Sequence, residues 1–333
     1  MSYWLVLAWV GVFLLAYAGV YLIRCYALKH LLDIPNQRSS HNLPTPRGGG
    51  LAIVVVFFVA VFWGYVNNLI QLDFVLALLA GIPVAVIGFM DDHRPVGIRI
   101  RLLIHLSSAI VASLLLAGLP AIPVMQATID LGVWGYAIAV LALVWWLNLF
   151  NFMDGIDGIA GSQAVFMALA LAVFTGFKVD GQGFLSLALG VTTLGFLIWN
   201  WPPAKIFMGD VGSGFLGFAL GVLMLAAGHA KPAMLYAGLI LSGLFVTDAS
   251  VTLLRRYCSG QTWYEAHCCH AYQHAARRYG HIKVVRAVWL INLTWLLPWA
   301  WICLLQPEYA WLVLMAAYIP LIVLVLKFNA GKG

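Results

Sequence analysis

The stretch LAIVVVFFVAVFWGYVNNLIQLDFVLALLAGIPVAVIGFMDD, residues 51–92, decides the fold class. It contains two long apolar runs, and Asp73 is the one charged residue in it before the pair Asp91-Asp92. About 20 apolar residues in a helix cross the hydrocarbon core of a bilayer. The stretch therefore predicts two membrane-spanning helices, the second of which ends in two acids at the membrane surface.

The rest of the chain repeats this pattern. Apolar runs broken by charged or Pro/Gly-rich segments predict eleven helices, at 3–23, 49–70, 74–90, 102–119, 134–150, 162–177, 183–200, 213–228, 233–254, 287–305 and 309–327. Of the 333 residues, 63% are hydrophobic and 9% are charged, against about 45–50% and about 25% in soluble domains. This excludes a water-soluble globule. We expect an all-α, polytopic integral membrane protein with about 11 transmembrane helices and a single domain over residues 1–333.

The basic residues predict the orientation. Eleven spans place the connecting segments alternately on the two sides, and one side carries 16 of the 18 Lys and Arg residues: Arg24, Lys29, Arg38, Arg47, Arg94, Arg99, Arg101, Lys205, Arg255, Arg256, Arg277, Arg278, Lys283, Arg286, Lys327 and Lys332. Cytoplasmic loops carry such an excess. The N-terminus is therefore expected outside and the C-terminus in the cytoplasm, and the net charge of +6 needs no nucleic-acid partner.

The five predicted cytoplasmic segments are dense in polar residues, whereas the outer connections are short and contain few residues suited to catalysis or binding. The segments are 24–48, 91–101, 151–161, 200–212 and 255–286. Because helix parity places all five on one surface, we expect an active site at the cytoplasmic face. Such a site keeps polar reactants wet while a lipid tail stays in the bilayer.

Acids and amides in these segments indicate a metal. Mg²⁺ favours one or two carboxylate or amide oxygens together with water and substrate phosphates, and Mn²⁺ can take its place. The segment Asn151-Phe152-Met153-Asp154-Gly155-Ile156-Asp157-Gly158 is the most informative, because glycines permit tight turns beside two carboxylates. For Asp91-Asp92 alone, helix capping remains an equal alternative.

Two glycine-rich turns open helices. Pro44-Thr45-Pro46-Arg47-Gly48-Gly49-Gly50 offers a rigid turn, a guanidinium and bare backbone amides, which suits a phosphate. The spacing Gly212-x-Gly214-x-x-Gly217 matches a dinucleotide fingerprint, but no βαβ context surrounds it. We expect those glycines to serve close helix packing.

The last cytoplasmic segment is rich in histidine. In His267-Cys268-Cys269-His270 the adjacent side chains point in different directions, so zinc is not favoured. His274, Arg277, Arg278 and His281 fit an anion-facing cationic segment, with a solvated loop as the alternative. Asp248, an acid within a predicted span, is either functional or an ion-pair partner of Arg255 two helical turns later.

Five motifs in order resemble one known family: DIPNxRxxHxxPTPRGGG (33–50), GFMDD (88–92), NLFNFMDGIDGIAG (148–161), KIFMGDVGSGFLG (205–217) and the His-rich last loop. The chain resembles the polyprenyl-phosphate N-acetylhexosamine-1-phosphate transferases over about residues 33–281. The resemblance implies a Mg²⁺-dependent reaction in which undecaprenyl phosphate attacks the β-phosphorus of a UDP-N-acetylhexosamine and UMP leaves. It also implies residence in the bacterial inner (cytoplasmic) membrane and admits a homodimer.

The resemblance also assigns residues. It implies Asn151 and Asp210 as metal ligands. It places the catalytic acids at Asp91, Asp92, Asp154 and Asp157. It places substrate-binding groups at Lys29, Arg38, Thr45, Arg47, Asn148, Lys205, His267, His270, Gln273 and Arg277. We expect Asp91 to position the lipid phosphate or to accept its proton; a two-step route with an Asp nucleophile stays open.

Departures from the peptidoglycan branch narrow the substrate. That branch has a His triplet in the last loop and PTMGG in the first, whereas this chain has His267-Cys268-Cys269-His270 and PTPRGGG. The resemblance therefore favours members that begin O-antigen synthesis with UDP-GlcNAc or with 6-deoxy sugars such as UDP-FucNAc and UDP-QuiNAc. The contact made at Cys268-Cys269 stays open.

Two rival functions remain. An intramembrane prenyltransferase that uses a polyprenyl diphosphate would explain the acids but has no use for PTPRGGG or FMGDVGSG. A transporter of lipid-linked solutes would place polar groups at the membrane midplane and often shows inverted repeats; the sequence has no evident repeat, and its charges gather at one face.

Overall fold

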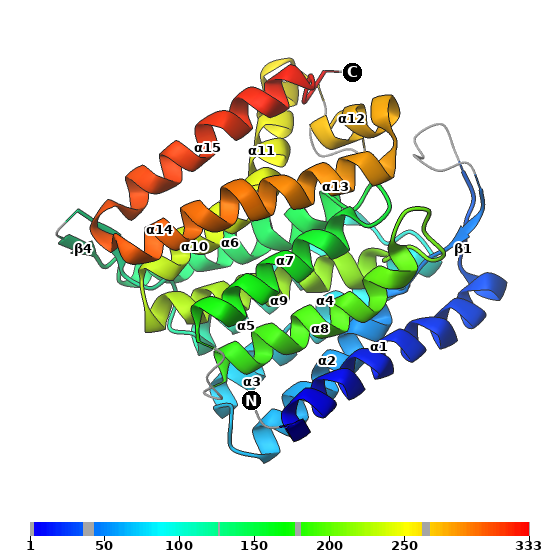
Figure 1. Ribbon diagram of the computed structural model, residues 1–333, viewed down its shortest axis with the longest axis horizontal. Coiled ribbons are helices and arrows are strands. Elements are labelled where there is room, and N and C mark those ends of the chain that lie inside the picture. The colour runs from blue at the N-terminus through cyan, green and yellow to red at the C-terminus, as the bar shows by residue number, and fades with distance from the viewer. Residues whose placement is uncertain (1–2, 36–42, 126, 177–180, 262–266, 333) are drawn as a thin grey trace.

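The computed structural model describes residues 3–35, 43–125, 127–176, 181–261 and 267–332. In that part of the chain nearly every element is a helix, and long helices lie side by side in one bundle (Figure 1). The first half contains α1 (Tyr3–His30), α2 (Gly50–Val66), α3 (Leu72–Leu79), α4 (Ile82–His93), α5 (Ile98–Leu115), α6 (Val133–Phe152) and α7 (Ile159–Phe174). The second half contains α8 (Gln182–Asn200), α9 (Asp210–Ala230), α10 (Ala233–Leu241), α11 (Gly243–Cys258), α12 (Ala271–Tyr279), α13 (His281–Ile291), the π-helix η1 (Asn292–Leu296), α14 (Leu297–Leu305), the 3-10 turn η2 (Pro307–Tyr309) and α15 (Ala310–Lys327).

Short strands occur only in two described hairpins. β1 (Leu32–Asp33) pairs antiparallel with β2 (Thr45–Pro46), so that Asp33 lies opposite Thr45. β3 (Ile122–Val124) pairs with β4 (Ala127–Ile129) in the same way. Each pair has two or three residues per strand, so the all-α class holds.

The prediction of an all-α protein with several membrane-spanning helices is confirmed. Eight described helices are long and apolar enough to cross a bilayer, or nine if α10 and α11, which meet at a 71° bend, form one broken span. The other two predicted spans fall on α2 and α7, whose 17 and 16 residues are short of the roughly 20 that a straight crossing needs. The protein is a polytopic all-α membrane protein, while the count of eleven spans and the orientation stay predictions.

Helix α9 is the centre of the bundle. Its most apolar stretch is buried throughout, and α2, α4, α6, α7, α8 and α10 pack around it. Such close packing requires small residues: a Cβ on Gly50 of α2 would overlap the backbone of Gly212, and one on Gly217 would overlap that of Trp146 in α6. The glycines at the start of α9 therefore serve helix packing, as expected. Because α9 is held so tightly, its first residue, Asp210, has a fixed place.

Candidate active site

One cavity collects residues from all five polar segments. It has a volume of about 250 Å³ and is lined by Asp33, Arg47, Asp92, Asp154, Gly155, Ile156, Asp157, Asn200, Phe207, Met208, Gly209, Asp210 and Gln273. Five of these side chains are carboxylates and only one, that of Arg47, is a cation. The cavity is therefore suited to a positively charged ligand or to a complex that carries one.

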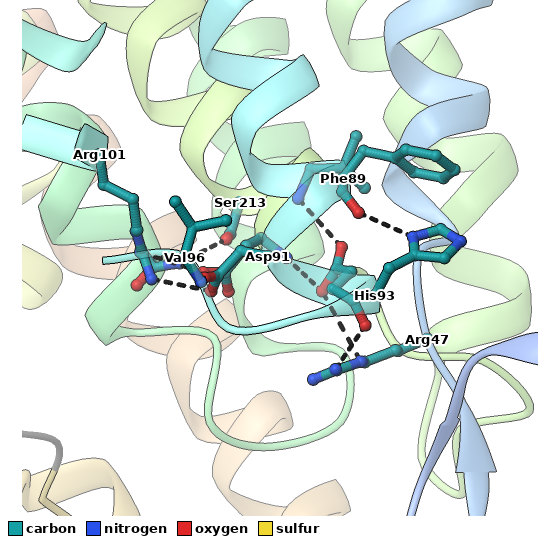
Figure 2. A network of polar contacts seen from close by, with 11 residues as sticks. Arg47, Phe89, Asp91, His93, Val96, Arg101 and Ser213 are labelled. Carbon is teal, nitrogen blue, oxygen red and sulfur yellow. Dashed lines mark hydrogen bonds and ion pairs between the residues drawn. The ribbon is translucent and has the colours of Figure 1, made fainter. Parts of the chain in front are cut away.

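The carboxylate of Asp92 caps the N-terminus of α9. The backbone N–H groups of Asp210 and Val211 donate to its two oxygens, at 3.1 and 3.3 Å. Arg47 secures the same corner, because its guanidinium donates to the backbone carbonyl of Asp92 and its Nε lies 3.9 Å from the carboxylate. Figure 2 shows Arg47 below the end of α4. Asp92 thus joins α4 to α9 and places Asp210 at the cavity.

Arg101, in the first turns of α5, bridges two acids. One guanidinium nitrogen lies 2.9 Å from Asp91 Oδ2 and the other lies 3.0 Å from Asp210 Oδ2. Asp91 Oδ1 accepts a further bond, of 2.6 Å, from the backbone N–H of Val96 (Figure 2). From the sequence, Arg101 was expected to act as one of the positive charges that set the orientation and not as a site residue. Nothing in the run Ile98-Arg99-Ile100-Arg101 indicated which arginine would turn inward.

The two residues expected to bind metal lie together. Asn151, at the end of α6, donates from Nδ2 to Ser213 Oγ of α9 at 3.1 Å. Its amide and the Asp91 carboxyl group are both within hydrogen-bonding distance of the Asp210 carboxylate. The Asn151 amide and two carboxylates are therefore neighbours, although they come from three different helices.

The loop between α6 and α7 is fixed at its second half. Asp157 Oδ2 accepts a bond of 3.0 Å from the N–H of Ala204 and lies 3.3 Å from His281 Nδ1. Gly158, with a positive φ of 74°, donates its N–H to Asn200 Oδ1 at 2.9 Å. These contacts fasten the loop to the segment before α9 and to α13. Asn200 was not predicted as a site residue, and only its polarity at the end of an apolar helix could have indicated it.

Asp154 differs from the other acids of the cavity. In the described part of the chain, its carboxylate has no hydrogen-bond or ion-pair partner. Burial raises the pKa of Asp154 well above its usual value, and the negative charges of Asp210, Asp92 and Asp157 raise it further. This carboxyl group can hold a proton or face a cation.

Several predicted substrate-binding residues do not line the cavity. Lys29 is exposed at the end of α1, and Thr45 Oγ1 donates to the Leu43 carbonyl. The amide of Asn148 donates to Val144 in its own helix. Lys205 Nζ lies 5.5 Å from the centre of the Trp199 ring. Arg38 lies outside the described residues.

The expectation of bare amides in the turn 44–50 is wrong for two glycines. Gly49 and Gly50 donate their N–H groups to the carbonyls of Phe207 and Met208, each at 2.9 Å. The turn is paired to the segment before α9 because α2 and α9 approach so closely at Gly50 and Gly212. Arg47 is the part of this turn that faces the cavity.

The His-rich segment begins a helix. His270 is buried at the N-terminus of α12, where it forms a capping box with Gln273. Asp248 accepts from the N–H groups of Ala271 and Tyr272, both at 2.9 Å, and lies 3.2 Å from His270 Nδ1. The suggested ion pair of Asp248 with Arg255 is wrong: Arg255 donates instead to the Ala330 carbonyl. Asp248 is a helix anchor because α12 folds back over α11.

Of the other residues in that segment, some line the cavity and others lie at the protein surface. Gln273 lines the cavity, whereas Arg277 donates to the Cys268 carbonyl at the exposed surface. Burial, His270 and Arg256 lower the pKa of His267 to about 4, so this imidazole is neutral near pH 7. His267 can therefore contact a nucleotide sugar only as a neutral hydrogen-bonding group.

The donor set suits a hard divalent cation. Among the described residues, no three His, Cys, Asp or Glu side chains group into a metal cage. Asn151 and Asp210 supply oxygen donors, and the unpaired Asp154 carboxylate adds negative charge nearby. Mg²⁺ accepts such a set, since it keeps several waters and binds substrate phosphates.

Comparisons with known proteins show what the chain is similar to. The family model described as glycosyl transferase family 4 matches residues 74–228. A probable undecaprenyl-phosphate N-acetylglucosaminyl 1-phosphate transferase of Bacillus subtilis is 34% identical over 239 residues, which cover 69% of this chain and 65% of that protein. A phospho-N-acetylmuramoyl-pentapeptide-transferase of Thermotoga maritima is 33% identical over 187 residues, 54% of this chain and 59% of that one.

A second phospho-N-acetylmuramoyl-pentapeptide-transferase, from Halalkalibacterium halodurans, is 30% identical over 227 residues, 63% of this chain and 68% of that protein. The matched regions thus span about three-fifths to two-thirds of the length of these relatives.

Proposed function

Because the chain belongs to glycosyl transferase family 4, we propose that it transfers an N-acetylhexosamine 1-phosphate from a UDP-N-acetylhexosamine to undecaprenyl phosphate and releases UMP. One of its relatives is named for undecaprenyl phosphate and N-acetylglucosaminyl 1-phosphate transfer, and another is a phospho-N-acetylmuramoyl-pentapeptide-transferase. The observation that carries the proposal is the single cavity to which all five polar segments contribute.

Two arginines contact the acids of the site: Arg47 lines the cavity, and Arg101 pairs with Asp210 in its wall. Arg47 lies on the Asp92 side and Arg101 on the Asp91 side, so their guanidinium groups flank the acids. Guanidinium groups bind phosphates with two parallel hydrogen bonds. We assign Arg47 and Arg101 to the phosphates of the two substrates, which would otherwise repel each other.

Asn151 and Asp210 would hold a Mg²⁺ ion, with Mn²⁺ as a substitute. Once bound, the ion would supply positive charge that lowers the repulsion between the phosphates and offsets the charge that develops on UMP. Ser213 supports this role by accepting the Asn151 Nδ2–H group, which holds the amide beside Asp210.

In the transfer itself, a lipid-phosphate oxygen forms a bond to the β-phosphorus while the bond from that phosphorus to the bridging oxygen breaks. A phosphate monoester has a second pKa near 6, so only part of the lipid phosphate carries a proton at pH 7. We assign that proton to Asp154, whose carboxylate faces the cavity without a partner. Asp91 is already bound by Arg101 and Val96, so its task is to position Arg101.

The lipid chain needs an apolar route to the cavity. A groove of about 440 Å³ between α11, α12, α13 and α15 includes Met153 and Ile159, which flank the loop that carries Asp154. A second groove, of about 640 Å³, lies along α2, α3 and α4 and includes Val55 and Phe89. We assign the polyprenyl chain to the first groove, because its wall is continuous with the acid loop.

Substitutions can distinguish the two grooves. Ala287 lines the first groove and Val55 the second, and both are exposed. Ala287→Trp is expected to raise KM for undecaprenyl phosphate at least about fivefold, roughly 1 kcal/mol, with little change in KM for the nucleotide sugar. Val55→Trp is the matched control. If Val55→Trp alone raises that KM, the chain follows α2 and α4.

For the sugar we favour UDP-GlcNAc or a 6-deoxy relative such as UDP-FucNAc or UDP-QuiNAc, in O-antigen initiation at the cytoplasmic face of a bacterial inner membrane. The support is the turn PTPRGGG and the His267-Cys268-Cys269-His270 segment, which depart from the peptidoglycan branch. Gln273 and the neutral His267 suit an uncharged sugar amide better than a peptide carboxylate.

The test is direct. Purified protein in detergent is incubated with undecaprenyl phosphate, Mg²⁺ and a panel of radiolabelled UDP-sugars, and the release of UMP is measured. We expect UMP together with a lipid-linked diphospho-sugar for at least one UDP-N-acetylhexosamine. Absence of UMP with every UDP-N-acetylhexosamine would overturn the proposal, and transfer of a prenyl group from a polyprenyl diphosphate would favour a prenyltransferase instead.

A further inference from the structure

Arg101 binds the carboxylate oxygen of Asp210 that the proposed metal site needs. Its guanidinium contacts Asp210 Oδ2 at 3.0 Å and Asp91 Oδ2 at 2.9 Å. Asp210 is the carboxylate to which the proposed function assigns the cation, and the Asn151 amide lies against it. A divalent cation that binds Asp210 through Oδ2 and this guanidinium cannot share the oxygen without close like-charge contact.

The surroundings of Arg101 allow it to leave Asp210 without losing its anchor. Its side chain is 27% exposed, and its bond to Asp91 comes from a different nitrogen, Nη1, than the bond to Asp210. Asp91 is itself fixed by the Val96 N–H group. The guanidinium can therefore turn about its contact with Asp91 and present its other nitrogens to the cavity.

We propose that Arg101 is a placeholder cation, which neutralises the Asp91–Asp210 pair until a divalent metal ion takes Asp210 and which then turns to the phosphates of the substrate. The proposal rests on the proposed function, because it takes Asp210 as a metal ligand. Arg101 is in this sense a positioning residue: it keeps two adjacent carboxylates in place and sets the affinity for the metal by competing with it.

The other cations near the cavity do not have this geometry. Arg47 contacts Asp92, whose carboxylate is already held by the first N–H groups of α9. Arg99, two residues before Arg101 in the same helix, is exposed and has no ion pair among the described residues. Arg99 is therefore a matched control of the same residue type in the same turn of α5.

The test uses Mn²⁺ alone as the probe, without either substrate. Free Mn²⁺ is measured by electron paramagnetic resonance while it is titrated into the purified, chelator-treated protein. Arg101→Gln is expected to bind Mn²⁺ about tenfold more tightly than the parent chain, because a positive charge a few Å from the metal has been removed. Arg101→Lys, which keeps the charge, and Arg99→Gln should leave the affinity within about twofold.

A second measurement separates competition from a simple structural role. Without added metal, Arg101→Gln should lower the melting temperature, and saturating Mn²⁺ should restore it to the value of the parent chain with Mn²⁺. A purely structural residue would give a loss that metal does not reverse. Circular dichroism before the titration checks that each variant is folded.

The outcomes are distinct. Equal or weaker Mn²⁺ binding by Arg101→Gln, while Asp210→Asn loses the binding, would overturn the placeholder role and leave the metal site standing. Binding of Mn²⁺ that is unaffected by Asp210→Asn would overturn the assignment of Asp210, and the placeholder role with it. Tighter binding by Arg101→Gln that Asp210→Asn abolishes would support both.

Discussion

Two helices of this protein, α9 and α12, have the same kind of N-terminal cap but different roles. At each start, an aspartate from a distant segment accepts the first two backbone N–H groups: Asp92 accepts those of Asp210 and Val211, and Asp248 accepts those of Ala271 and Tyr272. Both carboxylates are almost completely buried, at 3% and 2% exposure. Each therefore acts as a helix cap supplied from elsewhere in the chain.

What differs is the charge around each cap. Asp248 has two further partners, His270 Nδ1 and Thr252 Oγ1, so four groups of the protein contact its carboxylate. Around Asp92 lie two further acids, Asp154 and Asp210, and the cation Arg47, all in the wall of an open cavity. The capping geometry alone is thus no sign of chemistry; an acid is a candidate for chemistry where nearby carboxylates are not compensated.

The largest effect is expected at the α9 start. Asp210→Ala should reduce turnover at least about a thousandfold, since a metal ligand worth several kcal/mol of transition-state stabilisation is lost. The fold should persist, because Asp92 still caps α9 through backbone N–H groups. UMP release and the melting temperature are measured together, with the exposed Asp73→Ala as control. Turnover above a tenth of that of the parent chain would contradict the assignment of Asp210.

At the α12 start the effect should be on stability. Asp248→Ala leaves two backbone N–H groups and His270 without their acceptor and should cost about 3 kcal/mol in the free energy of unfolding. Unfolding in a denaturing detergent measures this loss against that of Asp73→Ala. A cost below about 1 kcal/mol would show that α12 is held by its apolar contacts alone, and the comparison of the two caps would fail.

The pH dependence of stability should differ between the two regions. Because the pKa of Asp154 is raised above its ordinary value of 3.8, the folded protein holds this proton more tightly than the unfolded chain does. In chelator-treated protein, stability should therefore fall as the pH rises from about 4 through the folded pKa. Asp154→Asn should match the parent chain near pH 4 and be more stable than it at higher pH. A difference in melting temperature between Asp154→Asn and the parent chain that stays the same at all pH values would contradict this.

The smallest effect is expected outside the cavity. Lys205 lies over Trp199, and Arg24 lies on the same ring at 6.0 Å, so Lys205→Gln should change turnover less than about threefold, in keeping with an exposed charge. Arg47→Gln is the contrasting variant, since Arg47 lines the cavity and should lose more than tenfold. A large effect of Lys205→Gln would indicate that the phosphate site lies nearer α1 and α8.

Much of the site could be predicted because its residues sit in short polar segments between apolar helices. Arg47, Asp92, Asp154, Asp157, Asp210 and Gln273 were predicted and line one cavity. Asn148 was predicted to bind substrate, whereas its amide donates to the Val144 carbonyl of its own helix. The direction in which a side chain points near a helix end depends on neighbouring helices, and a motif does not carry that information.

By itself the sequence determined that the protein is an all-α membrane protein and that most of its charged residues gather in five segments. Apolar length and charge bias are properties of consecutive residues, so they can be read along the chain. Only the tertiary structure decided that Asp92 and Asp248 are caps, that Arg101 bridges Asp91 and Asp210, and that Gly49 and Gly50 have no amide left for a phosphate. The physical reason is distance along the chain: the bond from Asp210 to Asp92 joins residues 118 positions apart, and only the packing of α4 against α9 brings them together.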